Sequence, residues 1–267
     1  MLFDLYTSLT TACSPYVRNM GYLSETIDMR TRARANQQAW QPHLDATQQF
    51  ILSAARRCQD NGKVVILGSG LLLDLPLAAL SAMFREVALK DVVCLPGTRK
   101  ELKRYANVTF AEHDVTGVAE QLYRNGVQGL SELPEPLFSR PDDEQDAGLV
   151  VSLNILSQLW VIPRTFASQR MRRLAPDRVD EWCGRITEAH YASLRSLSCP
   201  VCLIADHGFI KRDGSGAIIS RGSTIGGLVL PEPDESWTWN IAPLSSRSRD
   251  LSKELIVGAW DVICQVN

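Results

Sequence analysis

Glycines and polar side chains that could bind a ligand follow a series of apolar stretches in the sequence. Gly68, Ser69 and Gly70 come directly after the run VVIL, and the later stretches end at Asp91, Asp114, Asn154, and Asp206 with His207. Glycines allow a backbone to turn sharply or to approach a ligand closely. Asp91 follows Gly70 by about 20 residues, the spacing at which an acid accepts hydrogen bonds from a ribose diol. Asp114 supplies another acceptor one strand further along.

These residues must be positioned by strands that alternate with helical segments. The apolar, β-branched runs predict strands near 64–67, 87–91, 108–112, 149–153 and 201–205. Such runs are typical of strands buried on both faces of a parallel sheet. The alternation predicts a doubly wound α/β fold with right-handed crossovers, in which ligands bind beyond the carboxyl ends of the strands.

The two ends of the chain depart from this alternation. Residues 24–59 predict two helices joined near Pro42, so residues 1–60 are interpreted as a helical extension or lid. Residues 61–267 then form the ligand-binding catalytic domain, with 160–198 as a helical insertion that covers the substrate. The C-terminal stretches GFIKRDGSGAIIS, STIGGLVLP, SWTWNIAP and ELIVGAWDVI predict antiparallel strands at one edge of the sheet. The acidic, proline-containing segment 131–146 is expected to be a loop.

Composition limits the classes of function. The chain has 267 residues, of which 45% are hydrophobic, and a formal net charge of −2, so it supplies no global field for binding nucleic acid. The sequence predicts neither a secretory leader nor an uncharged apolar run long enough for a membrane helix, which favours a cytoplasmic protein. Seven cysteines, an odd number, favour reduced thiols, and Cys199 with Cys202 is interpreted as a pair of core residues. The four histidines show no metal-ligand spacing, so no metal site is expected.

The segment ILGSGLL, followed by acids at the second and third strand ends, resembles the class I S-adenosylmethionine-dependent methyltransferases over roughly residues 61–267. The resemblance implies that Gly68, Ser69 and Gly70 lie under the methionine part of S-adenosylmethionine. It implies that Asp91 holds the ribose, and that Asp114 and the backbone of Val115 meet the adenine. Asn154 matches the strand-four position that commonly faces the methyl group and the substrate.

The sequence departs from the family pattern at two positions. Ile66 stands where the family usually has an acid, and Leu72 replaces the third glycine. Asp74 is then the nearest acid for the methionine ammonium group. An NAD(P)-binding oxidoreductase is the main alternative, although G-x-G-x-x-G would need glycine where Leu73 stands. A catalytically silent, methyltransferase-like binding protein is the third hypothesis, which the substitutions at Ile66 and Leu72 favour.

The substrate side is less clearly marked, because methyl transfer relies mainly on proximity and alignment. Asn154 and His207 are the candidate catalytic residues, with His207 as a base or a substrate contact. The candidate substrate contacts lie on the covering segments and are Trp40, His43, His190 and Tyr191. Segment 160–198 has seven arginines and four acids, and Arg30 and Arg34 lie one helical turn apart. These features favour a small or medium-sized, anionic metabolite as the acceptor, whose identity the sequence does not specify.

Overall fold

The apolar stretches form a mixed sheet in a computed structural model that describes residues 2–136, 144, 146–244 and 251–262. Its parallel strands are β1 (Lys63–Leu67), β2 (Glu86–Asp91), β3 (Val108–Glu112), β4 (Leu149–Leu153) and the first part of β5 (Val201–Asp213). The strand order is β3-β2-β1-β4-β5-β8-β7, and β6 pairs with β5. The order changes direction between β1 and β4, which is where an open parallel sheet binds its ligand. The predicted α/β fold is confirmed.

Helices cover both faces of the parallel strands because successive side chains of a strand point to opposite faces. On β1, Val64 and Ile66 belong to the core beneath α4 (Gln37–Arg57) and α5 (Leu77–Met83). Val65 and Leu67 belong to the opposite core, which includes Leu194 of α10 (Pro176–Arg195). All four side chains are fully or almost fully buried, as expected of a strand covered on both faces.

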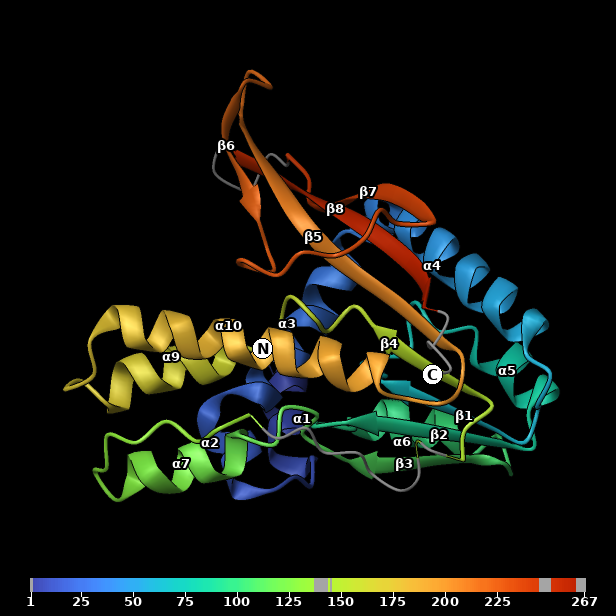
Figure 1. Ribbon diagram of the computed structural model, residues 1–267, viewed down its shortest axis with the longest axis horizontal. Helices are drawn as coiled ribbons and strands as arrows, with labels where there is room; N and C mark the ends of the chain where they lie inside the picture. The colour runs from blue at the N-terminus through green and yellow to red at the C-terminus, as the bar shows by residue number, and fades with distance from the viewer. Residues whose placement is uncertain (1, 137–143, 145, 245–250, 263–267) are drawn as a thin grey trace.

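Further helices gather at the carboxyl ends of the strands (Figure 1). Met20 of α2 (Pro15–Met20), Leu122 of α7 (Ala119–Val127) and Phe166 of α9 (Val161–Arg170) pack with Trp182 of α10 in a separate apolar cluster. The remaining described helices are α1 (Leu2–Thr10), α3 (Tyr22–Ala35) and α6 (Pro96–Leu102). No described helix has the length and apolar character needed to cross a membrane. The parallel strands therefore end beneath a helical layer.

The C-terminal strands are antiparallel, as predicted, but fewer than the sequence suggested. They are β6 (Ile218–Ser223), β7 (Glu235–Ala242) and β8 (Leu251–Val262), with β8 between β5 and β7. The stretch STIGGLVLP leaves β6 at Ser223 and turns at Gly226, whose φ is +63°, so the prediction of a strand there was wrong. Strand β5 continues to Asp213, and its hairpin with β6 projects from the body of the molecule (Figure 1).

The break between the two long N-terminal helices was predicted at the wrong residue. Helix α3 ends at Ala35, the side chain of its C-cap Asn36 donates to the carbonyl of Arg32, and Pro42 lies inside α4. A proline removes one helical hydrogen bond, which here leaves the carbonyl of exposed Gln38 open to water. Part of the predicted acidic loop, 137–143 and 145, falls outside the described residues.

Candidate functional site

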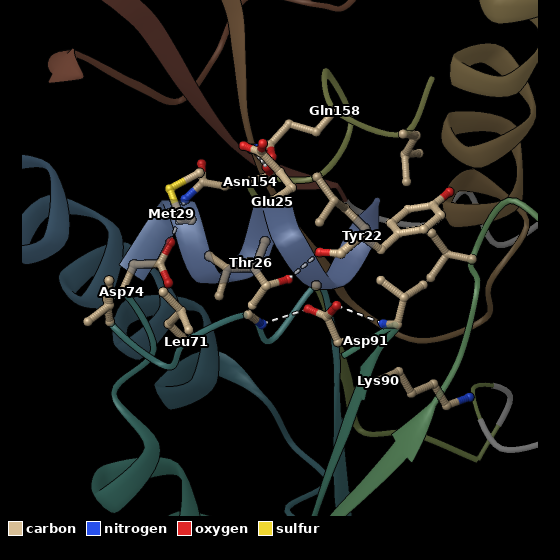
Figure 2. A pocket seen from close by; sticks show the side chains of 18 of the residues that line it. Tyr22, Glu25, Thr26, Met29, Leu71, Asp74, Lys90, Asp91, Asn154 and Gln158 are labelled. Carbon is tan, nitrogen blue, oxygen red and sulfur yellow. Dashed lines mark hydrogen bonds between the residues drawn. The ribbon is translucent and has the colours of Figure 1, made fainter. Parts of the chain in front are cut away.

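A pocket of about 230 Å³ lies at the carboxyl ends of β1 to β4, and α3 crosses it (Figure 2). Residues predicted for the site make up much of its lining: Trp40, His43, Gly68, Gly70, Asp74, Asp91, Asp114, Val115 and Asn154. They come from α4, from the loop after β1, and from the segments that follow β2, β3 and β4. The shared edge of parallel strands explains why residues so distant in sequence meet here.

Gly68 is required by the contact between β1 and β4. Its φ is +84°, and a Cβ there would lie 2.1 Å from Cγ2 of Ile155 and 2.9 Å from the carbonyl oxygen of Leu153. Gly70 has a φ of +50°, and a Cβ there would meet only the carbonyl oxygen of Gly68, at 4.0 Å. The first glycine therefore allows close packing of two strands, and the second leaves open space at the pocket.

Asp91 joins the end of β2 to this loop. Its carboxylate accepts the backbone N–H of Gly70 at 2.6 Å through Oδ2 and that of Val92 at 2.7 Å through Oδ1 (Figure 2). Burial raises the pKa of Asp91, and these backbone N–H groups oppose the rise. A carboxylate has about four acceptor positions, so it can accept further hydrogen bonds from a ligand.

Leu72 adopts a backbone conformation that usually requires glycine. Its φ is +63°, and its N–H donates to the carbonyl of Ser69 at 3.0 Å. A non-glycine residue in this region stores strain, and such residues cluster at functional sites. The loop therefore has a left-handed conformation at the position where the class I methyltransferases, which the sequence resembles, have their third glycine. Ile66, where that family usually has an acid, is fully buried in the core.

Asp74 and Asn154 form an acceptor pair at one end of the pocket. Asn154 Nδ2 donates to Asp74 Oδ2 at 2.7 Å (Figure 2), and Met29 of α3 lines the same pocket. Asn154 has a φ of +53°, and its Oδ1 is buried with no hydrogen-bond partner among the described residues. Burial raises the pKa of Asp74, which the hydrogen bond from Asn154 partly offsets. A buried acceptor without a partner is costly, so a donor from a ligand would be favoured here.

His43 presents a hydrogen-bond donor to the same end of the pocket. The indole N–H of Trp237 donates to His43 Nδ1 at 3.0 Å, and the imidazole stacks on Trp239 with a centroid distance of 4.0 Å. Burial lowers the pKa of His43 to about 3, so the ring is neutral near pH 7. Because an indole can only donate, Nδ1 must be the acceptor, and the proton lies on Nε2. Nε2 is 3.5 Å from Asn154 Nδ2, which is also a donor.

Asp114 is used mainly to position the loop that leads into α7. Its Oδ1 accepts from the backbone N–H and the hydroxyl of Thr116, and its Oδ2 accepts from the N–H of Ala119 at 2.8 Å. A carboxylate at a helix N-terminus satisfies free N–H groups and interacts favourably with the helix dipole. Val115 lines the pocket next to it. Direct contact of the Asp114 carboxylate with an adenine stays a prediction.

The structure does not bring Ser69 or His207 into the pocket lining. Ser69 is buried between the two glycines, with no partner for its Oγ among the described residues. His207 lies where the pairing of β5 with β8 shifts register, between Asp206 and Gly208. The sequence suggested that the strand stops before His207, but β5 continues beyond it.

His190 and Tyr191 also lie away from the pocket lining. His190 is buried within hydrogen-bond distance of Ser152, 2.9 Å from Nε2 to Oγ, and burial lowers its pKa to about 4. Tyr191 packs against the core on the α10 face of the sheet, with the guanidinium of Arg195 6.0 Å from its ring centroid. Within 160–198, all of which the structure describes, Ile162 of α9 alone lines the pocket.

Sequence reasoning missed the side chains that α3 contributes to the pocket. Tyr22, Glu25, Thr26 and Met29 line it, and Figure 2 shows them along one side of the helix. Their spacing of three and four residues is the signal that could have identified this face. Trp239 was missed because it comes from β7, about 170 residues after the glycine loop.

Comparisons with known proteins find similarity to solved structures. No protein-family model and no curated protein matches it. Solved structures with similarity include the "DhpI-SAM-HEP complex", at 15% identity and a TM-score of 0.41, over 92% of this chain and 99% of that chain. Another is a Burkholderia thailandensis 1,6-didemethyltoxoflavin-N1-methyltransferase bound to S-adenosylhomocysteine, at 12% identity and a TM-score of 0.34, over 88% and 90% of the two chains.

A third similar structure is the glycopeptide N-methyltransferase MtfA complexed with S-adenosylmethionine, at 13% identity and a TM-score of 0.36, over 81% of this chain and 94% of that chain. The mostly parallel sheet with antiparallel C-terminal strands is consistent with the class I methyltransferase fold that the sequence resembles.

Proposed function

We propose that the protein is an S-adenosylmethionine-dependent methyltransferase that acts on a small or medium-sized metabolite. The observation that carries the proposal is the acceptor pair of Asp74 and Asn154 beside the glycine loop that Asp91 holds. Together these groups suit a ligand with an ammonium group at one end and a hydroxylated sugar further along. The similar solved structures include complexes with the same cofactor, but the proposal rests on the pocket.

The residues present fit the methionine part of the cofactor. The carboxylate of Asp74 and the unpartnered Oδ1 of Asn154 are acceptors for its ammonium group. Nε2–H of His43 is a donor for its carboxylate. His43 was predicted from the sequence as a substrate contact, and its position next to Asn154 favours the cofactor instead. Asp74 thereby supplies the acid that Ile66 cannot.

The remaining cofactor contacts follow the strand ends. Asp91 would hold the ribose hydroxyls with its remaining acceptor positions, and Val115 would lie against the adenine. Gly70 leaves space for the cofactor to approach the loop backbone. When bound, the cofactor supplies an electrophilic methyl group on a sulfonium. The helices α3 and α4 then keep the reacting groups aligned and exclude water.

His43 is unsuited to act as a general base. Its Nδ1 already accepts from Trp237, its Nε2 carries the proton, and its pKa is about 3. His207, which the sequence suggested as a base or a substrate contact, does not line the pocket. Burial raises the pKa of both Asp74 and Asp91, but these carboxylates are proposed to bind the ammonium group and the ribose of the cofactor, so neither is assigned as a general base.

Calorimetric titration tests the proposal. S-adenosylhomocysteine should bind, NAD should not, and Asp91→Ala should weaken binding by more than about tenfold, because hydrogen bonds to a charged group contribute roughly 1.5–3 kcal/mol. Asp74→Asn should weaken it by a similar factor through loss of charge opposite the ammonium. Glu112→Gln, at the exposed end of β3, is the control and should bind like the unchanged protein.

The ligand series separates the three hypotheses. Binding of NAD without S-adenosylhomocysteine would instead indicate an oxidoreductase. Cofactor binding without a methylated product in a screen of metabolite extracts would favour the catalytically silent binding protein. Methylation confined to RNA or protein would refute the small-molecule substrate.

A further inference from the structure

A second cavity of about 930 Å³ adjoins the cofactor pocket. It lies between α1, α3, α4 and the segment that begins α6. Four apolar side chains line both cavities: Trp40, Leu44, Leu71 and Leu73. Leu71 and Leu73 flank the strained Leu72, two residues from the glycine loop. The second cavity therefore meets the cofactor pocket at the side where Asp74 and His43 lie.

The charged residues of this second cavity are all cations. Arg30, Arg34 and Lys100 line it, and no carboxylate is among its described lining residues. Arg30 is paired with Asp4 at 3.1 Å, which offsets part of its charge, and its Nε is buried without a partner in the described part of the chain. Arg34 is exposed and forms no ion pair among the described residues. The cavity thus has an excess of positive charge in a chain whose net charge is −2.

Aromatic rings accompany these cations. Phe3 and Tyr6 of α1 line the cavity and are 55% and 64% exposed, so their rings are accessible to a ligand. The guanidinium of Arg34 lies 5.6 Å from the ring centroid of Phe3, so the cation and the ring face the same space. Exposed apolar surface beside fixed charge is typical of a ligand-binding groove.

We propose that this second cavity binds the body of the methyl acceptor, and that the acceptor is an apolar, ring-containing organic anion. Its anionic group lies near Arg34 and Lys100, and its apolar part runs past Trp40 toward the cofactor pocket. The identification of the ligand as the acceptor rests on the proposed methyltransferase function. The binding of an apolar anion by this cavity does not.

Two fluorescent probes that differ by a sulfonate test the charge and the apolar surface separately. The anionic probe is 1-anilinonaphthalene-8-sulfonate, and the neutral one is N-phenyl-1-naphthylamine. The full chain should bind the anionic probe with a saturable, one-to-one titration. Arg34→Gln and Lys100→Gln should each lower the affinity for the anionic probe by about tenfold. Each should change the affinity for the neutral probe by less than about twofold. Lys103→Gln, an exposed cation close to Lys100 that does not line the cavity, is the matched control.

Affinity for S-adenosylhomocysteine, measured on the same variants, separates this inference from the proposed function. Unchanged cofactor affinity with weakened anion binding supports both. Anion binding by a chain that binds no cofactor would refute the methyltransferase and leave the anion site standing. Equal anion binding by Arg34→Gln, Lys100→Gln and the control would overturn the cavity proposal, as would displacement of the anionic probe by S-adenosylhomocysteine.

Discussion

Replacing His43 by Gln should flatten the pH dependence of folding stability between pH 7 and pH 5. In the folded chain burial lowers the pKa of His43 from 6.5 to about 3, whereas the unfolded chain takes up the proton near its ordinary value. Between these values the unfolded state binds more protons, so stability falls as the pH is lowered. Linkage over these two pH units amounts to about 2 kcal/mol for this one group.

Urea unfolding at pH 7, 6 and 5 measures this difference. The unchanged protein should lose about 2 kcal/mol more unfolding free energy over this range than His43→Gln. Buried Asp74 and Asp91 have raised pKa values and act in the opposite direction, but they are common to both proteins and cancel in the comparison. Equal pH slopes for the two proteins would refute a buried neutral imidazole.

A variant that keeps the imidazole provides the control. Trp237→Phe removes the indole N–H that donates to His43 Nδ1 and keeps an aromatic ring over the site. Its unfolding free energy should fall at every pH by about 1 kcal/mol, the contribution of one hydrogen bond. Because burial is what lowers the pKa of His43, most of the pH slope should remain.

Three further outcomes follow from the local geometry. Gly68→Ala should lower the unfolding free energy by about 2–4 kcal/mol in urea unfolding, because its Cβ would overlap Ile155. Gly70→Ala should lower it by only about 1 kcal/mol, so equal losses would contradict the close packing at Gly68. Asp114→Asn should lower the unfolding free energy by about 1 kcal/mol, and with it the melting temperature, because the carboxylate at the N-terminus of α7 loses its charge. An unchanged melting temperature would contradict this role of Asp114. Cys202 is buried, and burial raises the pKa of its thiol, so it should react with a thiol reagent only after unfolding. Rapid labelling of the folded protein at Cys202 would contradict this burial.

The first residues of the parallel strands could be predicted to within about one residue, most directly for β1 and β4, which are buried on both faces; β3 is partly exposed, and β5 continues well past its predicted end. Runs such as 64–67 and 149–153 are apolar without alternation, and few other structures need that pattern. The C-terminal region was less predictable. Its strands pair with β5 and with one another across long separations, so tertiary contacts decide whether a stretch such as 223–231 becomes a strand. The helix break at Asn36 was missed because Pro42 was taken as the break, whereas α4 contains this proline in its interior at the cost of one hydrogen bond.

Much of the lining of the candidate site could be predicted for a topological reason. Parallel strands end at one edge, so Asp91 and Asn154 had to lie near each other once the strands were identified. The same rule failed for His207, because β5 does not end at Asp206. The contributions of α3 and β7 depend on how these elements dock: residue spacing can group Tyr22, Thr26 and Met29 on one face of α3, but it does not specify what that face packs against. Trp239 reaches the pocket only through the pairing of β7 with β8.

The two departures from the family pattern show why residue type alone is a weak guide to this site. The loop needs a left-handed turn at position 72, and leucine adopts it with a φ of +63° while its flanking leucines line both cavities. The proposed ammonium subsite needs a negative charge, and Asp74 would provide it from the loop, where Asn154 Nδ2 donates to its carboxylate. Each requirement is met by conformation or by position in space. A departure from the family's residue types is therefore compatible with ligand binding when the backbone path and the placement of charge are retained.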